Sequence, residues 1–107
     1  MYYQYFVYIL KCADASFYTG ITSNLAKRFE EHQQGVKRDS YTYKRRPLEL
    51  VFQQEFNDVL QAIYLEKKIK GWTRAKKQAL IDGNGELLQL LSECRNASHH
   101  KYNPENN

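Results

Sequence analysis

Apolar side chains run unbroken through residues 5–10, and several of them are β-branched or aromatic. Such a run is typical of a strand that is buried on both faces and lies inside a sheet. Residues 13–16 bring turn-forming Asp14 and Ser16, and residues 17–21 return to a strand pattern. The N-terminal part of the chain therefore predicts a β-hairpin.

The rest of the chain alternates between helical patterns and one further strand. The pattern predicts a third strand over residues 48–56 and four helices: one between a cap at 22–24 and a stop at Gly35, then 59–70, 74–81 and 86–94. Asp58 and Thr73 are good N-caps, because their side chains can accept hydrogen bonds from the free N–H groups of a first helical turn. The order β-β-α-β-α-α, with one more helix, predicts a small α+β domain in which helices flank a sheet.

The length of 107 residues corresponds to one domain. We expect residues 1–95 to form it and the polar tail 96–107 to be disordered. The N-terminus lacks the features of a signal peptide, and no stretch approaches a membrane span. Cys12 and Cys94 fit neither a disulfide framework nor a zinc pattern, so we expect two reduced thiols in a cytoplasmic protein; a single bridge between them is the alternative.

Positive charge is concentrated in the middle of the chain. The formal net charge is +4, but residues 37–77 alone carry eleven Lys and Arg against five Asp and Glu. A central basic excess favours a polyanionic partner such as nucleic acid. The alternative is a solvated basic face that binds nothing.

One carboxylate falls where a core residue is expected. Val59, Ala62 and Ile69 mark an inward stripe on the helix over residues 59–70, and steps of three and four place Glu66 on the same stripe. A buried carboxylate is costly unless it is paired or binds a metal. The alternative is a helix-surface ion pair with Lys70, four residues later.

Two tyrosines of the hairpin, Tyr8 and Tyr18, raise a question of register. Side chains alternate between the faces of a strand, so the two phenols share a face only if the residue numbers of paired positions add up to an even value. That requires a loop of odd length, such as residues 14–16. A two-residue loop over 14–15 would place the phenols on opposite faces.

Further along, Arg28 and His32 are four residues apart and share a helix face, although such side chains often only extend to water.

These residues together resemble a known enzyme family. "FVY" at 6–8 and "YTG" at 18–20 resemble the two halves of the GIY-YIG nuclease motif, "NLAKRFEEH" at 24–32 supplies Arg28 and His32 at the family's spacing, and "AIYLEKKIKGWTRAKK" at 62–77 resembles its metal-binding segment. The resemblance covers roughly residues 3–82. It is closest to small stand-alone bacterial GIY-YIG proteins, which also resemble the N-terminal domain of the C component of excinuclease ABC. Phe6, Val7 and Thr19 depart from the motif at mainly backbone positions.

The resemblance implies a three-stranded antiparallel sheet and metal-dependent hydrolysis of phosphodiester bonds. Glu66 would hold a hydrated Mg²⁺ or Mn²⁺. Tyr8 would act as general base on the attacking water, and Tyr18 would orient that water or the phosphate. Arg28 would stabilise the developing negative charge, and His32 would tune a tyrosine or relay a proton. Two further positions follow from the family pattern: Gly20 in the second half-motif and Asn84 as the nearest match to an asparagine late in the domain.

The predicted substrate is nucleic acid, with DNA favoured over RNA and a role in repair or recombination. Six basic residues are expected to bind its backbone: Lys44, Arg45, Arg46, Lys70, Arg74 and Lys77. One alternative is a catalytically weak or inactive nucleic-acid-binding module that keeps the fold. Another is an interaction domain with tyrosine and leucine surfaces. We expect a monomer or a weak dimer.

Overall fold

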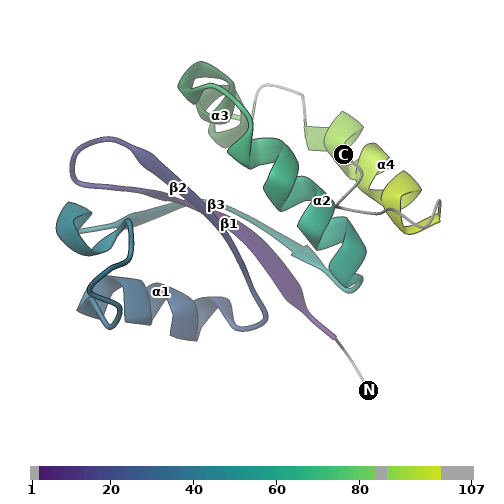
Figure 1. The fold of residues 1–107 in the computed structure, drawn as a ribbon. Helices are drawn as coiled ribbons and strands as arrows, with labels where there is room; N and C mark the ends of the chain where they lie inside the picture. The colour runs from purple at the N-terminus through teal and green to yellow at the C-terminus, as the bar shows by residue number, and fades with distance from the viewer. Residues whose placement is uncertain (1–2, 84–86, 100–107) are drawn as a thin grey trace.

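The computed structural model describes residues 3–83 and 87–99, with the side chains of 97–99 left out (Figure 1). It confirms the α+β prediction. In chain order the elements are β1 (Tyr5–Lys11), β2 (Phe17–Thr22), α1 (Leu25–Gln34), the short 3₁₀ helix η1 (Tyr43–Arg45), β3 (Glu49–Phe56), α2 (Val59–Lys70), α3 (Arg74–Ile81) and α4 (Leu87–His99). The sheet is antiparallel throughout, with the strand order β2-β1-β3.

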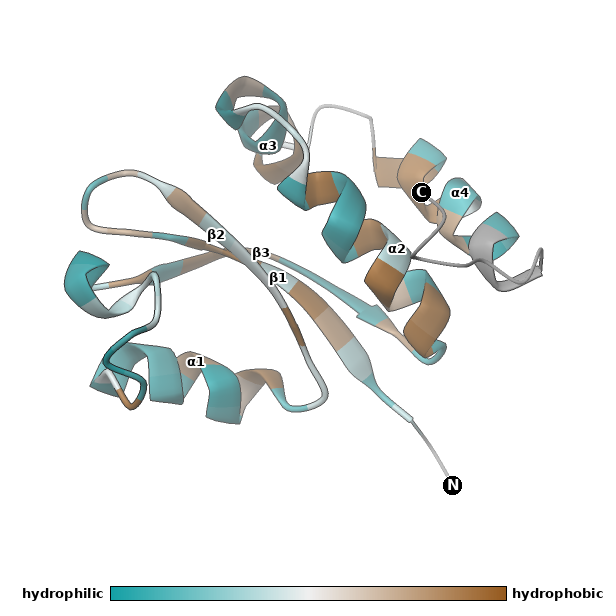
Figure 2. Cartoon of the chain, in the orientation of Figure 1, coloured by the Kyte–Doolittle hydropathy of each residue, from teal (hydrophilic) through white to brown (hydrophobic). Residues whose placement is uncertain are grey.

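Helices cover both faces of this sheet, which explains why β1 is apolar from Tyr5 to Leu10. Val7 and Ile9 point to one face of the sheet, whereas Tyr8 and Leu10 point to the other. All four side chains are fully buried. The first face carries the larger core and is covered by α2, with α3 and α4 beyond it, whereas α1 packs on the second face (Figure 1). Apolar residues gather on β1 and α2, and α1 is mostly hydrophilic (Figure 2).

The hairpin loop between β1 and β2 has three residues, 13–15. Its ends are joined by a hydrogen bond from Cys12 N to Ser16 O of 2.8 Å. Ala15 takes a left-handed φ of 68°, and the Asp14 carboxylate accepts hydrogen bonds from the Ser16 N–H and hydroxyl at 3.1 and 2.6 Å. The loop therefore has the odd length that places both phenols on one face, and it begins one residue earlier than the 14–16 example.

The helix ends follow the predicted capping residues. Asn24 is the residue that caps α1, and Gly35, with φ of 70°, ends this helix. The Asp58 carboxylate accepts from Leu60 N at 2.8 Å, and Thr73 caps α3. Helix α2 ends at Gly71, also as predicted.

The Asp58 cap gives a direct test of helix α2. Asp58→Ala should lower the free energy of unfolding by about 1 kcal/mol, because the first-turn N–H groups lose their acceptor. Chemical denaturation measures the change, and Asp58→Asn, which keeps an acceptor oxygen, is the matched control. Equal losses in both variants would show that the cap contributes through its charge rather than through the hydrogen bond.

Two expectations need correction. The buried positions of α2 are Ala62, Leu65 and Ile69, whereas Val59 is 40% exposed, so the inward stripe lies one residue before Glu66. Helix α4 continues to His99, because no Gly or Pro interrupts it there, so the tail cannot begin at residue 96. The remainder of the expected disordered tail, 100–107, lies outside the described residues.

The two cysteines settle the disulfide question. Both are free and buried, and they belong to different clusters on the two faces of the sheet: Cys12 packs with Leu25 and Leu48, and Cys94 with the α2 core. The alternative of a bridge between them is therefore wrong. No helix in the described part of the chain is long and apolar enough to cross a membrane.

Candidate active site

The hairpin register places both tyrosine side chains on the face covered by α1. Tyr8 pairs with Gly20, and Leu10 pairs with Tyr18, so the paired numbers add up to an even value. The ring of Tyr8 lies across Gly20: a Cβ built at Gly20 would be 2.5 Å from the Tyr8 Cζ. Glycine is required here because any side chain would occupy the space of the phenol.

A chain of hydrogen bonds leads from Tyr8 away from the sheet. The Tyr8 hydroxyl lies 3.0 Å from His32 Nε2, and His32 Nδ1 lies 2.9 Å from Thr42 Oγ1. Thr42 Oγ1 lies in turn 3.0 Å from Ser40 Oγ, which also accepts from the Thr42 N–H at 3.3 Å. Helix α1 supplies the histidine, and the segment before η1 supplies both hydroxyls.

Tyr18 completes an aromatic cluster around this histidine. Its ring centroid lies 5.2 Å from His32, edge to face, and 6.3 Å from Tyr8. On another side Tyr18 stacks on Tyr41 at 6.2 Å. The two motif tyrosines and the histidine therefore form one contiguous group, and the even register is what places both phenols on this face.

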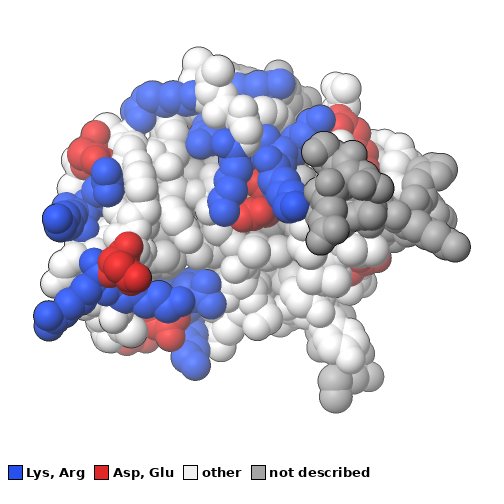
Figure 3. All heavy atoms as spheres, viewed as in Figure 1, with Lys and Arg blue, Asp and Glu red and all other residues white. Residues whose placement is uncertain are grey.

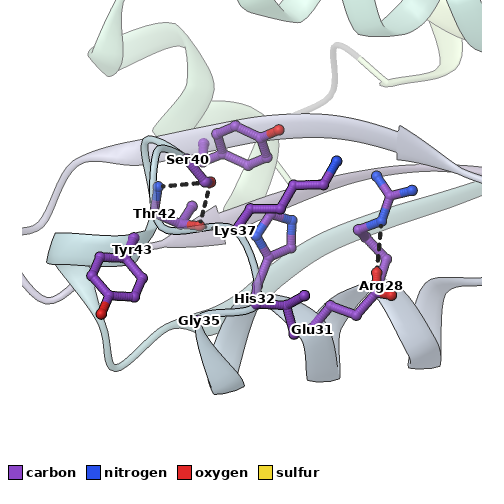
Figure 4. A pocket seen from close by; sticks show the side chains of 10 residues that line it. Arg28, Glu31, His32, Gly35, Lys37, Ser40, Thr42 and Tyr43 are labelled. Atoms are coloured by element: carbon purple, nitrogen blue, oxygen red, sulfur yellow. Dashed lines mark hydrogen bonds and ion pairs between the residues drawn. The ribbon is translucent and has the colours of Figure 1, made fainter.

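A cavity of about 100 Å³ opens beside the cluster, between α1 and the segment that follows it. Its lining includes Tyr18, Arg28 and His32. Arg28 Nε lies 3.3 Å from the Glu31 carboxylate, one turn further along the helix. Figure 4 shows Arg28, His32 and Lys37 pointing to the same side. The cavity is lined by two cationic groups, Arg28 and Lys37, and by one carboxylate, Glu31, so its formal charge is positive.

Burial and neighbouring charges set the protonation of the two central groups. Burial raises the pKa of Tyr8 to about 12, with a further rise from Tyr18 and an opposing effect of Arg28. Burial also lowers the pKa of His32, and Arg28 lowers it further. At pH 7 the phenol is therefore protonated and the imidazole is neutral. In the free protein the positive charge of Arg28 does not make Tyr8 acidic.

Glu66 comes from the other layer of the domain, on α2. Its side chain is 12% exposed, and its Oε2 lies 2.6 Å from Lys70 Nζ. The ion pair that was the alternative prediction is therefore present. A nearly buried carboxylate is nevertheless unusual for a helix-surface pair, because the protein gives up most of its hydration.

The comparisons with known proteins decide the family. Residues 4–79 match the model of the GIY-YIG catalytic domain. This chain belongs to the GIY-YIG family. Catalytic domains of this family are endonuclease domains that bind nucleic acid, and they generally use divalent metals. The resemblance drawn from the motifs is confirmed.

Several bacterial proteins of similar length align with most of this GIY-YIG protein. A UPF0213 protein of Limosilactobacillus reuteri is 42% identical over 92 residues, which are 81% of this chain and 93% of that protein. A UPF0213 protein of Staphylococcus aureus is 43% identical over 78 residues, or 73% and 94% of the two chains. The solution structure of a Bacillus halodurans UPF0213 protein, 33% identical, matches with a TM-score of 0.52 over 81% of this chain and 92% of its own. These names state no activity.

A divalent metal, as GIY-YIG nucleases generally use, is compatible with the donors present. Within residues 3–83 and 87–99, no cluster of three or more His, Cys, Asp or Glu could hold a metal ion. Glu66 is instead a single carboxylate, and Mg²⁺ is commonly bound by one or two carboxylates with water and substrate phosphate completing its shell. The side chain of Lys70 is 54% exposed, so it can swing into solvent and leave the Glu66 carboxylate free to bind a cation. A hydrated cation held by Glu66 fits this arrangement.

Basic side chains gather in two groups on the face shown in Figure 3, one over the C-terminal half of α2 and over α3, the other over α1 and the segment after it. Of the first group, Lys70 pairs with Glu66, and Lys77 is half-buried. Arg74 donates to Ala15 O in the hairpin loop and covers the Phe17 ring at 4.8 Å. Arg74 therefore already has a structural role.

The second group contains the three basic residues predicted near the site. Lys44 is exposed. Arg45 Nε lies 3.1 Å from Asp14, and its guanidinium covers the Tyr41 ring at 3.8 Å. Arg46 donates to the carbonyl oxygens of Tyr43 and Gln33 at 2.9 and 3.3 Å, so its charge is directed inward. Of these three, Lys44 is the one best placed to meet a phosphate from solution.

Sequence reasoning missed three residues of the site: Lys37, Ser40 and Thr42. They lie in a polar segment without periodicity, which carried no signal except the hydroxyls of "SYT" at 40–42. Asn84, predicted from the family pattern, lies outside the described residues.

Proposed function

We propose that this GIY-YIG protein is a metal-dependent endonuclease that hydrolyses phosphodiester bonds in nucleic acid, with DNA as the favoured substrate. The observation that carries the proposal is the 3.0 Å contact between the Tyr8 hydroxyl and His32, beside a cavity lined by Tyr18 and Arg28. The phenol of Tyr8, the neutral imidazole of His32 and the guanidinium of Arg28 lie close to one cavity. Hydrolysis of a phosphodiester needs such a combination of acid–base groups and a cation.

Each side chain has a role that suits its position. The neutral imidazole of His32 can take the phenolic proton, after which Tyr8 can accept a proton from the attacking water. The guanidinium of Arg28 can exchange Glu31 for the phosphoryl oxygens and stabilise their growing charge. The hydroxyl of Tyr18 can orient the water or the phosphate. A cation held by Glu66 would polarise the phosphate and stabilise the leaving oxygen.

The setting we propose is DNA repair or recombination. The sequence shows no pattern of a helix that reads bases in the major groove. Backbone contacts from Lys44, Lys70 and Lys77 would direct such an enzyme to DNA by its shape rather than by its sequence.

A cleavage assay with Mg²⁺ or Mn²⁺ tests the proposal on linear, branched and single-stranded DNA and RNA. Glu66→Gln keeps the shape of the side chain and removes its charge, so we expect a loss of cleavage by roughly 10²-fold or more. Glu49→Gln, at an exposed glutamate of β3, is the matched control and should cleave normally. Undiminished cleavage by Glu66→Gln would contradict the metal assignment.

A second candidate function is a nucleic-acid-binding module with little catalysis. The raised pKa of Tyr8, to about 12, favours it, because a protonated phenol is a poor base. The same preparations distinguish the two: DNA retardation in a gel without any cleavage in either metal would support the binding module and overturn the enzyme.

A further inference from the structure

We propose that Thr42 is a positioning residue that fixes the tautomer of His32, and that Thr42 and Ser40 carry the proton of Tyr8 to solvent. This inference rests on the proposed nuclease function and adds two residues to it. The hydrogen-bond chain that runs from Tyr8 to Ser40 carries it, with successive contacts of 3.0, 2.9 and 3.0 Å.

The hydroxyl of Thr42 is buried inside the protein and does not lie on its surface. Its residue surface is 1% exposed, and its Oγ1 touches both His32 Nδ1 and Ser40 Oγ. A neutral imidazole has one N–H and one bare nitrogen. If Tyr8 donates to Nε2, then Nδ1 must carry the hydrogen and donate it to Thr42. In the proposed arrangement the threonine oxygen accepts from Nδ1–H and donates its own hydrogen to Ser40, which selects the tautomer that leaves Nε2 free to accept from the phenol.

Proton transfer along this chain balances without creating an imidazolium. The Tyr8 O–H bond breaks and its proton joins His32 Nε2, while the Nδ1 proton passes to Thr42 Oγ1. The hydroxyl proton of Thr42 passes to Ser40, whose own proton leaves to a water molecule at the cavity. Tyr8 becomes a phenolate and His32 ends as the other neutral tautomer. Exchange with solvent restores the first tautomer before the next turnover.

This proton relay through His32, Thr42 and Ser40 avoids an energetic cost that is specific to this site. A cationic His32 would be disfavoured by burial and by Arg28, which is why the pKa of His32 is lowered. A route that keeps the imidazole neutral avoids that cost. The titratable or charged groups that face His32 come from four elements: Arg28 and Glu31 on α1, Tyr8 on β1, Tyr18 on β2, and Lys37 in the segment after α1.

Imidazole ¹⁵N NMR on the intact chain tests the positioning role without any need for activity. We expect His32 of the native protein to carry its proton on Nδ1. Thr42→Val removes the hydroxyl at constant shape and should shift the population towards the Nε2–H tautomer, whereas Thr42→Ser should keep the native form. A native His32 protonated on Nε2, or an unchanged tautomer in Thr42→Val, overturns the proposal. Thermal melting confirms that each variant is folded.

Single-turnover cleavage tests the proton route. Thr42→Val should slow cleavage by about 10- to 100-fold and shift its pH dependence to higher pH, and Thr42→Ser should restore most of the rate, in line with the usual size of general acid–base effects. Ser40→Ala should slow cleavage as well. A native rate and pH profile in Thr42→Val would refute the relay while leaving the nuclease intact. If the native protein does not cleave at all, the proposed function fails, and the relay fails with it.

Discussion

Tyr8→Phe should reduce cleavage by roughly 10²- to 10⁴-fold, the range by which general acid–base groups accelerate reactions. The substitution removes only the hydroxyl that lies 3.0 Å from His32 Nε2. The ring stays in place, because Tyr8 is fully buried and its aromatic carbons fill the space above Gly20. Single-turnover cleavage with Mg²⁺, on whichever DNA the native protein cuts best, measures the effect.

The control is another tyrosine of the same strand. Tyr5→Phe alters a phenol that packs on the opposite face of β1, against the α2 core, and should leave cleavage unchanged. Chemical denaturation should show that Tyr8→Phe costs about 0.5–1.5 kcal/mol, the net value of one hydrogen bond. Full activity in Tyr8→Phe would show that this phenol is structural and that another group activates the water.

Gly20→Ala should destabilise the protein by about 1–3 kcal/mol, the cost of overpacking a core, and should disable the site as well. The added Cβ would be 2.5 Å from the Tyr8 Cζ, and the ring cannot retreat because its own residue is fully buried. Displacement of the ring breaks its contact with His32. The free energy of unfolding and the cleavage rate should therefore both fall.

Gly71→Ala is the matched control for this second experiment. Gly71 has a helical φ of −80°, and the nearest atom to a Cβ there is a backbone oxygen at 3.6 Å, an ordinary contact. Alanine at Gly71 should be neutral or slightly stabilising, because it restricts the unfolded chain. If Gly20→Ala were as stable and active as Gly71→Ala, the close approach of Tyr8 to the β2 backbone would be wrong.

The strand and helix positions could be predicted because local chemistry determines them. The unbroken apolar run of β1 required a central strand, and Asp58, Thr73 and Gly35 mark helix ends through hydrogen bonds to their own neighbours. The hairpin itself was predictable for the same reason. Its loop length, and with it the parity of the register, was not, because the choice depends on Ala15 accepting a left-handed φ, which alanine seldom does.

The candidate site residues came from the family resemblance, and the sequence could indicate that they lie close together only where they belong to a periodic element. Tyr8, Tyr18 and His32 have a strand register or a helix face that places them together. Thr42 has neither: it reaches His32 because the segment before η1 folds back over α1, and no periodicity encodes that return. Glu66 shows the opposite limit, since a helical step of one residue decides whether it or Leu65 enters the core.

The hairpin loop is held in place by contacts from two other segments of the chain. Arg45, next to the segment that holds Thr42, pairs with Asp14 at 3.1 Å, and its carbonyl accepts from Ala13 N at 2.8 Å. Arg74, at the start of the helix that follows α2, donates to Ala15 O. Three consecutive loop residues thus anchor both the layer with the histidine and the layer with the glutamate. The loop therefore ties the two layers to each other through the sheet edge, so we expect them to move as one body rather than independently.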